Sequence, residues 1–168
     1  MSITNLNPYI NFNGDAEKAI KLYERALGAK SENVMRWSDL PPNEGGNVSP
    51  EHKNRIMHAL LHVGDFELML ADTPPDQPAH VGNRSHVNLS FDDLSDMQKK
   101  FEALSAGGNV TMPIQDVFWG AKFGMLKDEF GVQWMFNCQL EQPQAGNGGQ
   151  RKSEAARAGN GGKQRAQR

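Results

Sequence analysis

The chain has 168 residues, with 18 lysines and arginines against 20 aspartates and glutamates. This length fits one domain or two small ones, and the nearly balanced charge excludes a strong overall attraction to nucleic acids. The single cysteine excludes an intramolecular disulfide, and no apolar run approaches the roughly 20 residues of a membrane-spanning helix. The N-terminal residues lack the basic start and apolar run of an export signal, so we expect a cytoplasmic protein without membrane contact.

The first module of structure is predicted by apolar spacing. Residues 8–12 are typical of an extended strand, and Asp15 follows as a candidate helix cap. Apolar side chains then recur at helical spacing over residues 16–27, and Gly28 ends this pattern. Further along, alternating apolar residues over 60–70 flank a Gly-Asp turn, which predicts a β-hairpin.

Both patterns recur in the second half of the chain. The strand and helix return at one constant offset, which places Phe12 at Phe91 and Gly28 at Gly107. The hairpin returns at a shorter constant offset, which places Leu60 at Leu126. A polar loop at residues 38–55, which the second half lacks, accounts for the difference between the two offsets.

The repeat predicts the fold class. We expect an α+β fold of two tandem βαβββ modules that form a curved mixed sheet around a cleft. The predicted parts of this domain, residues 1–140, are module 1 (5–72), a linker (73–85) and module 2 (86–138).

The C-terminal segment, residues 141–168, differs from this domain. It holds six basic and two acidic residues, a net charge of +4, which leaves −6 for residues 1–140. It contains neither aromatic nor β-branched residues, so we predict a disordered basic tail rich in Gly, Gln and Ala. Such a tail is the one feature through which the chain could act as an assembly or nucleic-acid adaptor, and nucleic acid is otherwise not expected.

Strand parity, together with the chemistry of the side chains, predicts which residues line the cleft. In the strand after the linker, Val87, Leu89 and Phe91 are apolar and should pack under a helix, which leaves His86 and Asn88 on the opposite face. By the same rule, the buried set of the first module includes Ile10, Phe12, Phe66, Leu68 and Leu70. The predicted ligand-binding residues of the cleft are Tyr9, Asn11, His58, Met69, His86, Asn88, Trp119, Phe123 and Met135.

Several motifs carry a family resemblance. They are PYINFNG at 8–14, LYERALGA at 22–29, HALLHVGDFELMLAD at 58–72, FWGAKFG at 118–124 and KDEFGVQWMFN at 127–137. With the tandem modules, these motifs resemble the PhnB-like branch of the vicinal oxygen chelate superfamily, over about residues 5–138. The superfamily includes glyoxalase I, extradiol dioxygenases, fosfomycin-resistance enzymes and bleomycin-binding proteins, so the resemblance implies the glyoxalase/bleomycin resistance fold more than a function. Members of this branch are often labelled demethylubiquinone methyltransferase, but the sequence has no nucleotide-binding glycine fingerprint.

The resemblance also places a possible metal centre. Metal-dependent members hold one divalent ion with two residues from first strands and two from last strands, which here correspond to Asn7, His86, Met69 and Met135. Only His86 is a good ligand, because thioethers are soft donors that do not suit Ni, Mn, Fe or Zn. We therefore expect neither a metal nor another cofactor. If a metal is bound, we expect His86 and Glu67, which lies on the strand face of Met69.

Two further groups of residues suggest chemistry. His58 and His62 share one strand face, and Asp72 ends the neighbouring strand, so a His–carboxylate acid/base pair is conceivable, although a local hydrogen bond is the more common role of such histidines. Trp119 and Phe123 each precede a glycine, a pattern that suggests an aromatic wall where a ligand comes close to the backbone.

The sequence thus predicts a metal-independent protein that binds an apolar or planar small molecule and forms a homodimer. The alternative is a metal-dependent lyase, isomerase or dioxygenase of the same superfamily. The sequence leaves the presence of any catalytic activity open.

Overall fold

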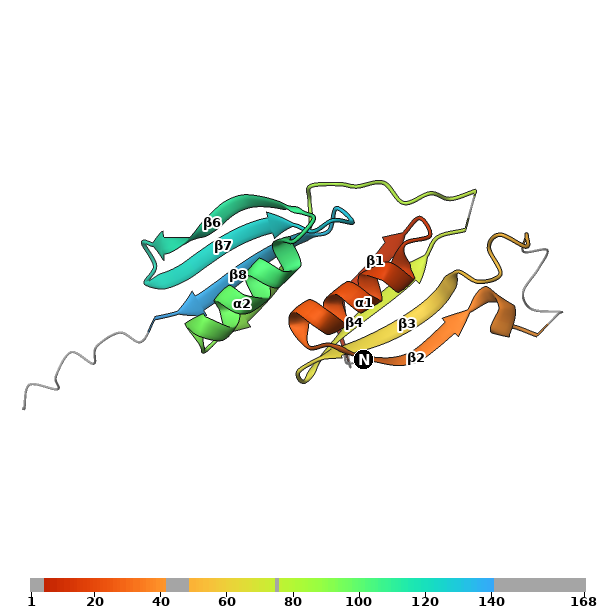
Figure 1. Ribbon diagram of the computed structural model, residues 1–168, viewed down its shortest axis with the longest axis horizontal. Coiled ribbons are helices and arrows are strands. Elements are labelled where there is room, and N and C mark those ends of the chain that lie inside the picture. Colours follow the sequence, from red (N-terminus) through yellow and green to blue (C-terminus); the bar gives the residue numbers. More distant parts are fainter. Residues whose placement is uncertain (1–4, 42–48, 75, 141–168) are drawn as a thin grey trace, which may run out of the picture.

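The computed structural model describes residues 5–41, 49–74 and 76–140, and Figure 1 shows their arrangement. The predicted tail at 141–168 lies outside these residues. The elements follow the order βαβββ twice, which confirms the predicted tandem modules. In the first module they are β1 (Tyr9–Phe12), α1 (Ala16–Leu27), β2 (Lys30–Arg36), a short 3-10 helix (Trp37–Asp39), β3 (Ile56–Val63) and β4 (Phe66–Asp72). In the second they are β5 (Val87–Phe91), α2 (Leu94–Ser105), β6 (Asn109–Val117), β7 (Ala121–Lys127) and β8 (Gln133–Gln139).

The eight strands form two four-stranded mixed sheets with the same internal order. The first sheet runs β1-β4-β3-β2 and the second runs β5-β8-β7-β6, with one parallel pair in each. In the first parallel pair Tyr9 lies opposite Met69, and in the second Asn88 lies opposite Met135. These pairs are related by the two offsets that the sequence repeat predicts, so the repeat holds at the level of strand register.

The hairpins of the two modules differ by one residue. Leu60 lies opposite Met69 in the first sheet, but Met125, not Leu126, lies opposite Met135 in the second. The chain between these equivalent partners is one residue longer in the second module. The predicted equivalence of Leu60 with Leu126 is therefore wrong, and Leu126 faces the core instead.

Helix α1 is capped by a residue at the end of strand β4. Asp15 occupies the N-cap position but binds Lys18 at 2.9 Å and does not accept from the helix backbone. The carboxylate of Asp72 takes that role and accepts from the backbone N–H of Ala16 at 3.0 Å and of Gly14 at 2.7 Å. In α2, by contrast, the N-cap Asp93 binds the helix backbone itself.

One apolar core joins the modules. Each helix packs on its own sheet, and α1 and α2 also contact each other in the middle of the molecule (Figure 1). The buried Tyr23 of α1 donates its hydroxyl to Asp128 at 2.8 Å, and the Trp134 indole donates to the same oxygen at 3.0 Å. Burial and the neighbouring Asp128 carboxylate both raise the pKa of Tyr23. This buried network ties α1 to the second sheet.

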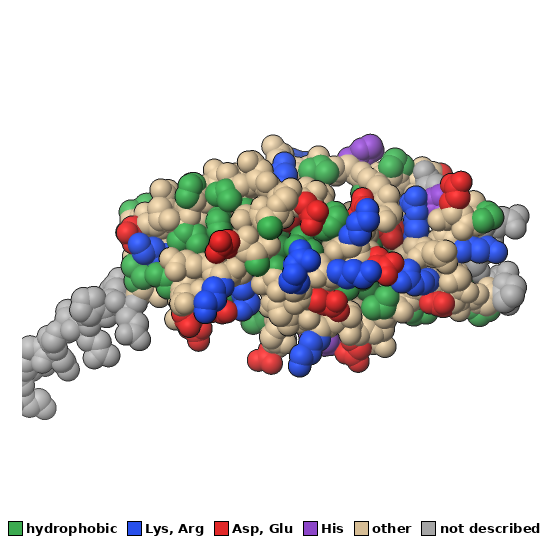
Figure 2. Space-filling view, viewed as in Figure 1, with side chains coloured by type: hydrophobic (Ala, Val, Ile, Leu, Met, Phe, Trp, Pro, Cys, Tyr) green, Lys and Arg blue, Asp and Glu red, His purple; other side chains and the backbone are tan. Residues whose placement is uncertain are grey.

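The face of the molecule that Figures 1 and 2 show carries many charged side chains. Figure 2 shows Lys and Arg side chains interspersed with Asp and Glu side chains over it, with apolar side chains between them. Within residues 5–41, 49–74 and 76–140, neither α1 nor α2 has the length and apolar content that crossing a bilayer requires.

The prediction that Phe66 belongs to the buried set of the first module is wrong, because its side chain is 79% exposed at the start of β4.

Candidate functional site

The face of the first sheet opposite α1 brings together three of the predicted ligand-binding residues. Tyr9 and Met69 lie side by side on β1 and β4, and the Tyr9 hydroxyl lies 3.4 Å from Nδ1 of His58 on β3. The two rings are 5.9 Å apart and tilted by 32°. Burial raises the pKa of the Tyr9 hydroxyl, which keeps it protonated and able to donate a hydrogen bond at neutral pH. Asn11 is exposed two positions further along β1.

The histidines of β3 do not pair with Asp72. The Asp72 carboxylate is buried, and besides capping α1 it accepts from the backbone N–H of Ile56 at 3.0 Å. His58 instead meets Tyr9, and His62 Nε2 lies 2.7 Å from Glu32 on β2. The suggested acid/base pair with Asp72 is therefore wrong, because three backbone groups already use this carboxylate.

Aromatic residues gather in the β6–β7 turn and on the adjoining strand β7 of the second sheet. The rings of Trp119 and Phe123 are 5.6 Å apart at 71°, and the Trp119 indole donates to Asn137 at 3.4 Å. Phe118, which is not one of the predicted ligand-binding residues, is 97% exposed. Its ring packs edge-on against Trp119, with the ring centres 4.9 Å apart. We call Phe118, Trp119 and Phe123 the aromatic wall. Asn88 and Met135 lie opposite each other on the neighbouring strands of this sheet.

The two glycines beside the wall have structural roles. Gly124 is buried on the opposite face of β7, where a Cβ atom would approach Phe101 of α2 to 3.0 Å. Gly120 has a φ of 79° in the β6–β7 turn. Gly124 thus allows the helix to come close to the strand, and the predicted close approach of a ligand to the backbone does not apply to it.

The positions that could hold a metal do not fit a hard divalent cation. The Asn7 amide donates to Glu67 Oε2 at 2.5 Å, and Asn5 donates to the same oxygen at 3.1 Å. Glu67 is thereby engaged by two amides, and its neighbour on this face, Met69, offers only a thioether. His86 is exposed just before β5. Within the described parts of the chain, no cluster of three His, Cys, Asp or Glu residues could coordinate an ion.

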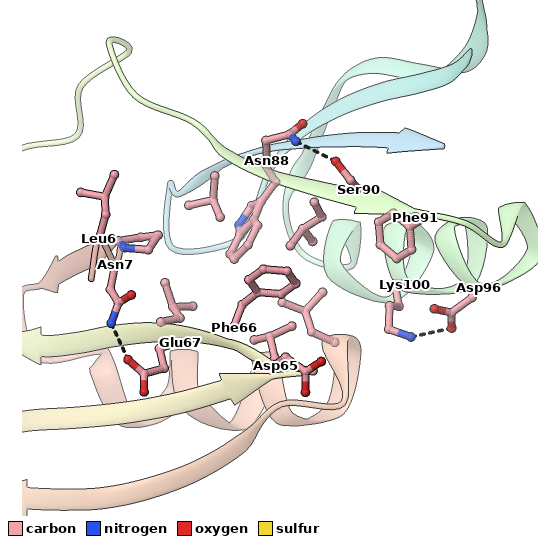
Figure 3. Close-up of a pocket in the computed structure, with 18 of the residues that line it drawn as sticks. Leu6, Asn7, Asp65, Phe66, Glu67, Asn88, Ser90, Phe91, Asp96 and Lys100 are labelled. Carbon is pink, nitrogen blue, oxygen red and sulfur yellow. Dashed lines mark hydrogen bonds and ion pairs between the residues drawn. The ribbon is translucent and has the colours of Figure 1, made fainter. Parts of the chain in front are cut away.

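A cavity of about 920 Å³ lies where the two modules meet. It is lined by the segment before β1, the β3–β4 hairpin, β5 and one side of α2. Figure 3 shows Phe66 pointing into it from the first module, with Asn88 and Ser90 on the opposite strand. Of the nine predicted ligand-binding residues only Asn88 lines this junction cavity. Sequence periodicity could not predict it, because its walls come from segments far apart in the chain.

The comparisons with known proteins agree with this architecture. The family model described as the Glyoxalase/Bleomycin resistance protein/Dioxygenase superfamily matches residues 5–136. Protein YjdN of Escherichia coli (strain K12) is 30% identical over 146 residues, which cover 82% of this chain and 97% of that protein.

Solved structures give the same result. Protein PA1353 from Pseudomonas aeruginosa is 36% identical, with a TM-score of 0.72 over 82% of this chain and 98% of that chain. A Bacillus cereus PhnB protein, described as a putative 3-demethylubiquinone-9 3-methyltransferase, is 19% identical with a TM-score of 0.63, and the match covers 80% of this chain and 99% of that chain. At that identity the second likeness concerns the fold alone.

Proposed function

The chain belongs to the Glyoxalase/Bleomycin resistance protein/Dioxygenase superfamily, and from this premise we propose that it binds an apolar or planar small molecule without a metal ion. The aromatic wall is the observation that carries this proposal. Trp119 keeps 44% of its surface exposed although it packs against two other rings. Exposed, mutually supported aromatic side chains provide rigid stacking surfaces for planar ligands.

A polar group beside these rings would orient the ligand, because Asn137 accepts from the Trp119 indole at 3.4 Å. Tyr9 and His58 form a separate donor–acceptor pair on the first sheet. The methionines Met69 and Met135 add polarizable apolar surface that adapts to ligand shape. The fold thus supports a site that combines a few directional groups with apolar contacts.

The alternative, a metal-dependent lyase, isomerase or dioxygenase, would use His86 with Glu67. The donor set speaks against it, because Glu67 is engaged by Asn5 and Asn7 and the remaining positions are thioethers.

A symmetric homodimer also forms part of the proposal. In the part of the chain that the structure describes, each sheet ends in unpaired edge strands, and apolar side chains such as Val34 of β2 and Val110 of β6 are exposed on them. Light scattering should give twice the chain mass of 18.6 kDa. A mass of one chain at micromolar concentration would contradict this part of the proposal.

The binding proposal is tested with 1-naphthol as a planar probe, after native mass spectrometry of the purified protein for co-purifying small molecules. Trp119→Ala should weaken 1-naphthol binding roughly five- to a hundredfold, the usual effect of removing a central aromatic contact. Phe66→Ala removes an exposed ring elsewhere on the chain and should change the affinity less than about twofold. Equal effects of both substitutions would contradict the proposal.

A further inference from the structure

We infer that the junction cavity is a second binding site, selective for an organic cation with an apolar body. This inference goes beyond the proposed function, which concerns the open faces of the two sheets. It is carried by the cavity's size, by the exposed apolar side chains within it and by the imbalance of charge on its walls.

The size of the cavity suits a small molecule. Its volume of about 920 Å³ lies in the range of pockets that enclose ligands of drug size. It is formed jointly by both modules, and pockets between structural units are common ligand sites. Volume alone does not select a ligand, so the chemistry of the walls decides its class.

Some of the apolar side chains that line the cavity are unusually exposed to water. Phe66 is 79% exposed and Leu6 is 91% exposed, although both line a concave surface (Figure 3). Leu89 and Phe91 of β5 line the opposite wall and are only half-buried. Large apolar side chains that remain open to water inside a pocket favour the binding of an apolar group.

The charged part of the lining is predominantly negative. Four carboxylates line the cavity, and Lys100 is the one cation among its lining residues. Lys100 is already paired with Asp96 in an i,i+4 ion pair, which is drawn in Figure 3. In the part of the chain that the structure describes, no ion pair involves the other three carboxylates. These three are Asp65, Glu67 and Asp92.

Charge complementarity therefore selects a cation. An anion would face three carboxylates whose charge no ion pair of the described residues neutralises, and like-charge juxtaposition opposes binding. A quaternary or primary ammonium would be attracted by the carboxylates and by the face of Phe66, while its apolar chain would cover Leu6 and Leu89. The lining thus specifies an amphipathic organic cation and disfavours neutral and anionic analogues.

Isothermal titration calorimetry of the full chain at low ionic strength tests this inference. The probe is octyltrimethylammonium, with octanesulfonate as the anion of matched chain length. We expect the cation to bind at least about tenfold more tightly, and this preference should shrink as salt is added, because partly exposed charges are screened. Equal affinity for the two probes would overturn the inference.

Matched variants locate the binding. Asp65→Asn/Asp92→Asn should weaken octyltrimethylammonium binding at least about fivefold, whereas Asp76→Asn/Asp116→Asn removes two exposed carboxylates outside the cavity and should leave binding within about twofold. Likewise, Phe66→Ser should weaken binding at least about fivefold, and Val110→Ser, at an exposed apolar side chain outside the cavity, should not.

Other occupants of the cavity give different results. If a second copy of the chain fills it, Phe66→Ser will shift light scattering toward the monomer and cation binding will be absent. If residues 141–168 fill it, octyltrimethylammonium will bind only after their deletion. Either result would overturn the inference, and neither bears on 1-naphthol binding to the aromatic wall.

Discussion

The two modules share strand order and register, but their buried carboxylates act over different distances. In the first module Asp72 accepts from three backbone N–H groups of its own module. In the second module Asp128 binds the backbone of its own turn and also Tyr23 of the other module. The comparison shows that a duplicated unit can fold by the same pattern while one buried acid takes on the task of joining the copies.

The largest expected effect on stability follows from removing the Asp128 carboxylate, which connects the two modules. Asp128→Ala would leave the Tyr23 hydroxyl, the Trp134 indole and two backbone N–H groups without their acceptor in a site that is 3% exposed. We expect a loss of about 3 to 5 kcal/mol in the free energy of unfolding, measured by urea denaturation.

The matched change in the first module sharpens the contrast. Asp72→Ala removes three hydrogen bonds, one fewer than Asp128→Ala, and the exposed Gly14 N–H can bind water instead. The expected loss is smaller, about 2 to 3 kcal/mol. A greater loss for Asp72→Ala than for Asp128→Ala would contradict the assignment of the joining role to Asp128.

A second contrast compares the centre of one sheet with the edge of the other. Leu70 is fully buried on β4, so Leu70→Ala should cost about 2 to 5 kcal/mol by opening a core cavity. Leu89 packs against the core, as predicted, but it is only half-buried and also lines the junction cavity. Leu89→Ala should therefore cost only about 1 kcal/mol. Equal losses in thermal denaturation would mean that the junction is packed like the core.

The last expected effect concerns the dependence of stability on pH. Tyr23→Phe removes one of the hydrogen bonds to Asp128 and should cost about 1 to 2 kcal/mol at neutral pH. Because burial and Asp128 raise the pKa of Tyr23, the folded state keeps the phenol protonated while the unfolded chain ionises near its ordinary pKa of 10. This stabilisation is present below pH 10 and is lost as the pH rises above it.

The difference between wild type and Tyr23→Phe should therefore shrink between about pH 10 and 11.5, as measured by urea denaturation at each pH. A difference that stays constant over this range would show that ionisation of Tyr23 does not contribute.

Much of the fold was predictable because local patterns and tertiary packing agree. The pairs Tyr9–Met69 and Asn88–Met135 are related by the two predicted offsets of the sequence repeat, since apolar alternation and turn positions fix strand register. Phe66 shows the limit. Its alternation with Leu68 predicts a buried side chain. Phe66 instead lies directly after the β3–β4 turn, at the end of the sheet that α1 does not cover, and its side chain is exposed.

The candidate site was less predictable for a related reason. Strand parity correctly separated Asn88 from the helix-facing side of β5, where Phe91 stacks on Phe136. Parity could not show that Asn7 engages Glu67 or that Tyr9 meets His58, because these pairs depend on which strands become neighbours. The role of Asp72 was hidden likewise, because its partners come from other segments.

Binding of 1-naphthol to the full chain, with and without metal, tests the central claim most directly. The dissociation constant is measured after chelator treatment and again with added Mn(II), Fe(II), Ni(II) or Zn(II). We expect the same dissociation constant within about twofold under all these conditions, and weaker binding by Trp119→Ala. Binding that requires about one metal ion per chain and disappears in His86→Ala would contradict it.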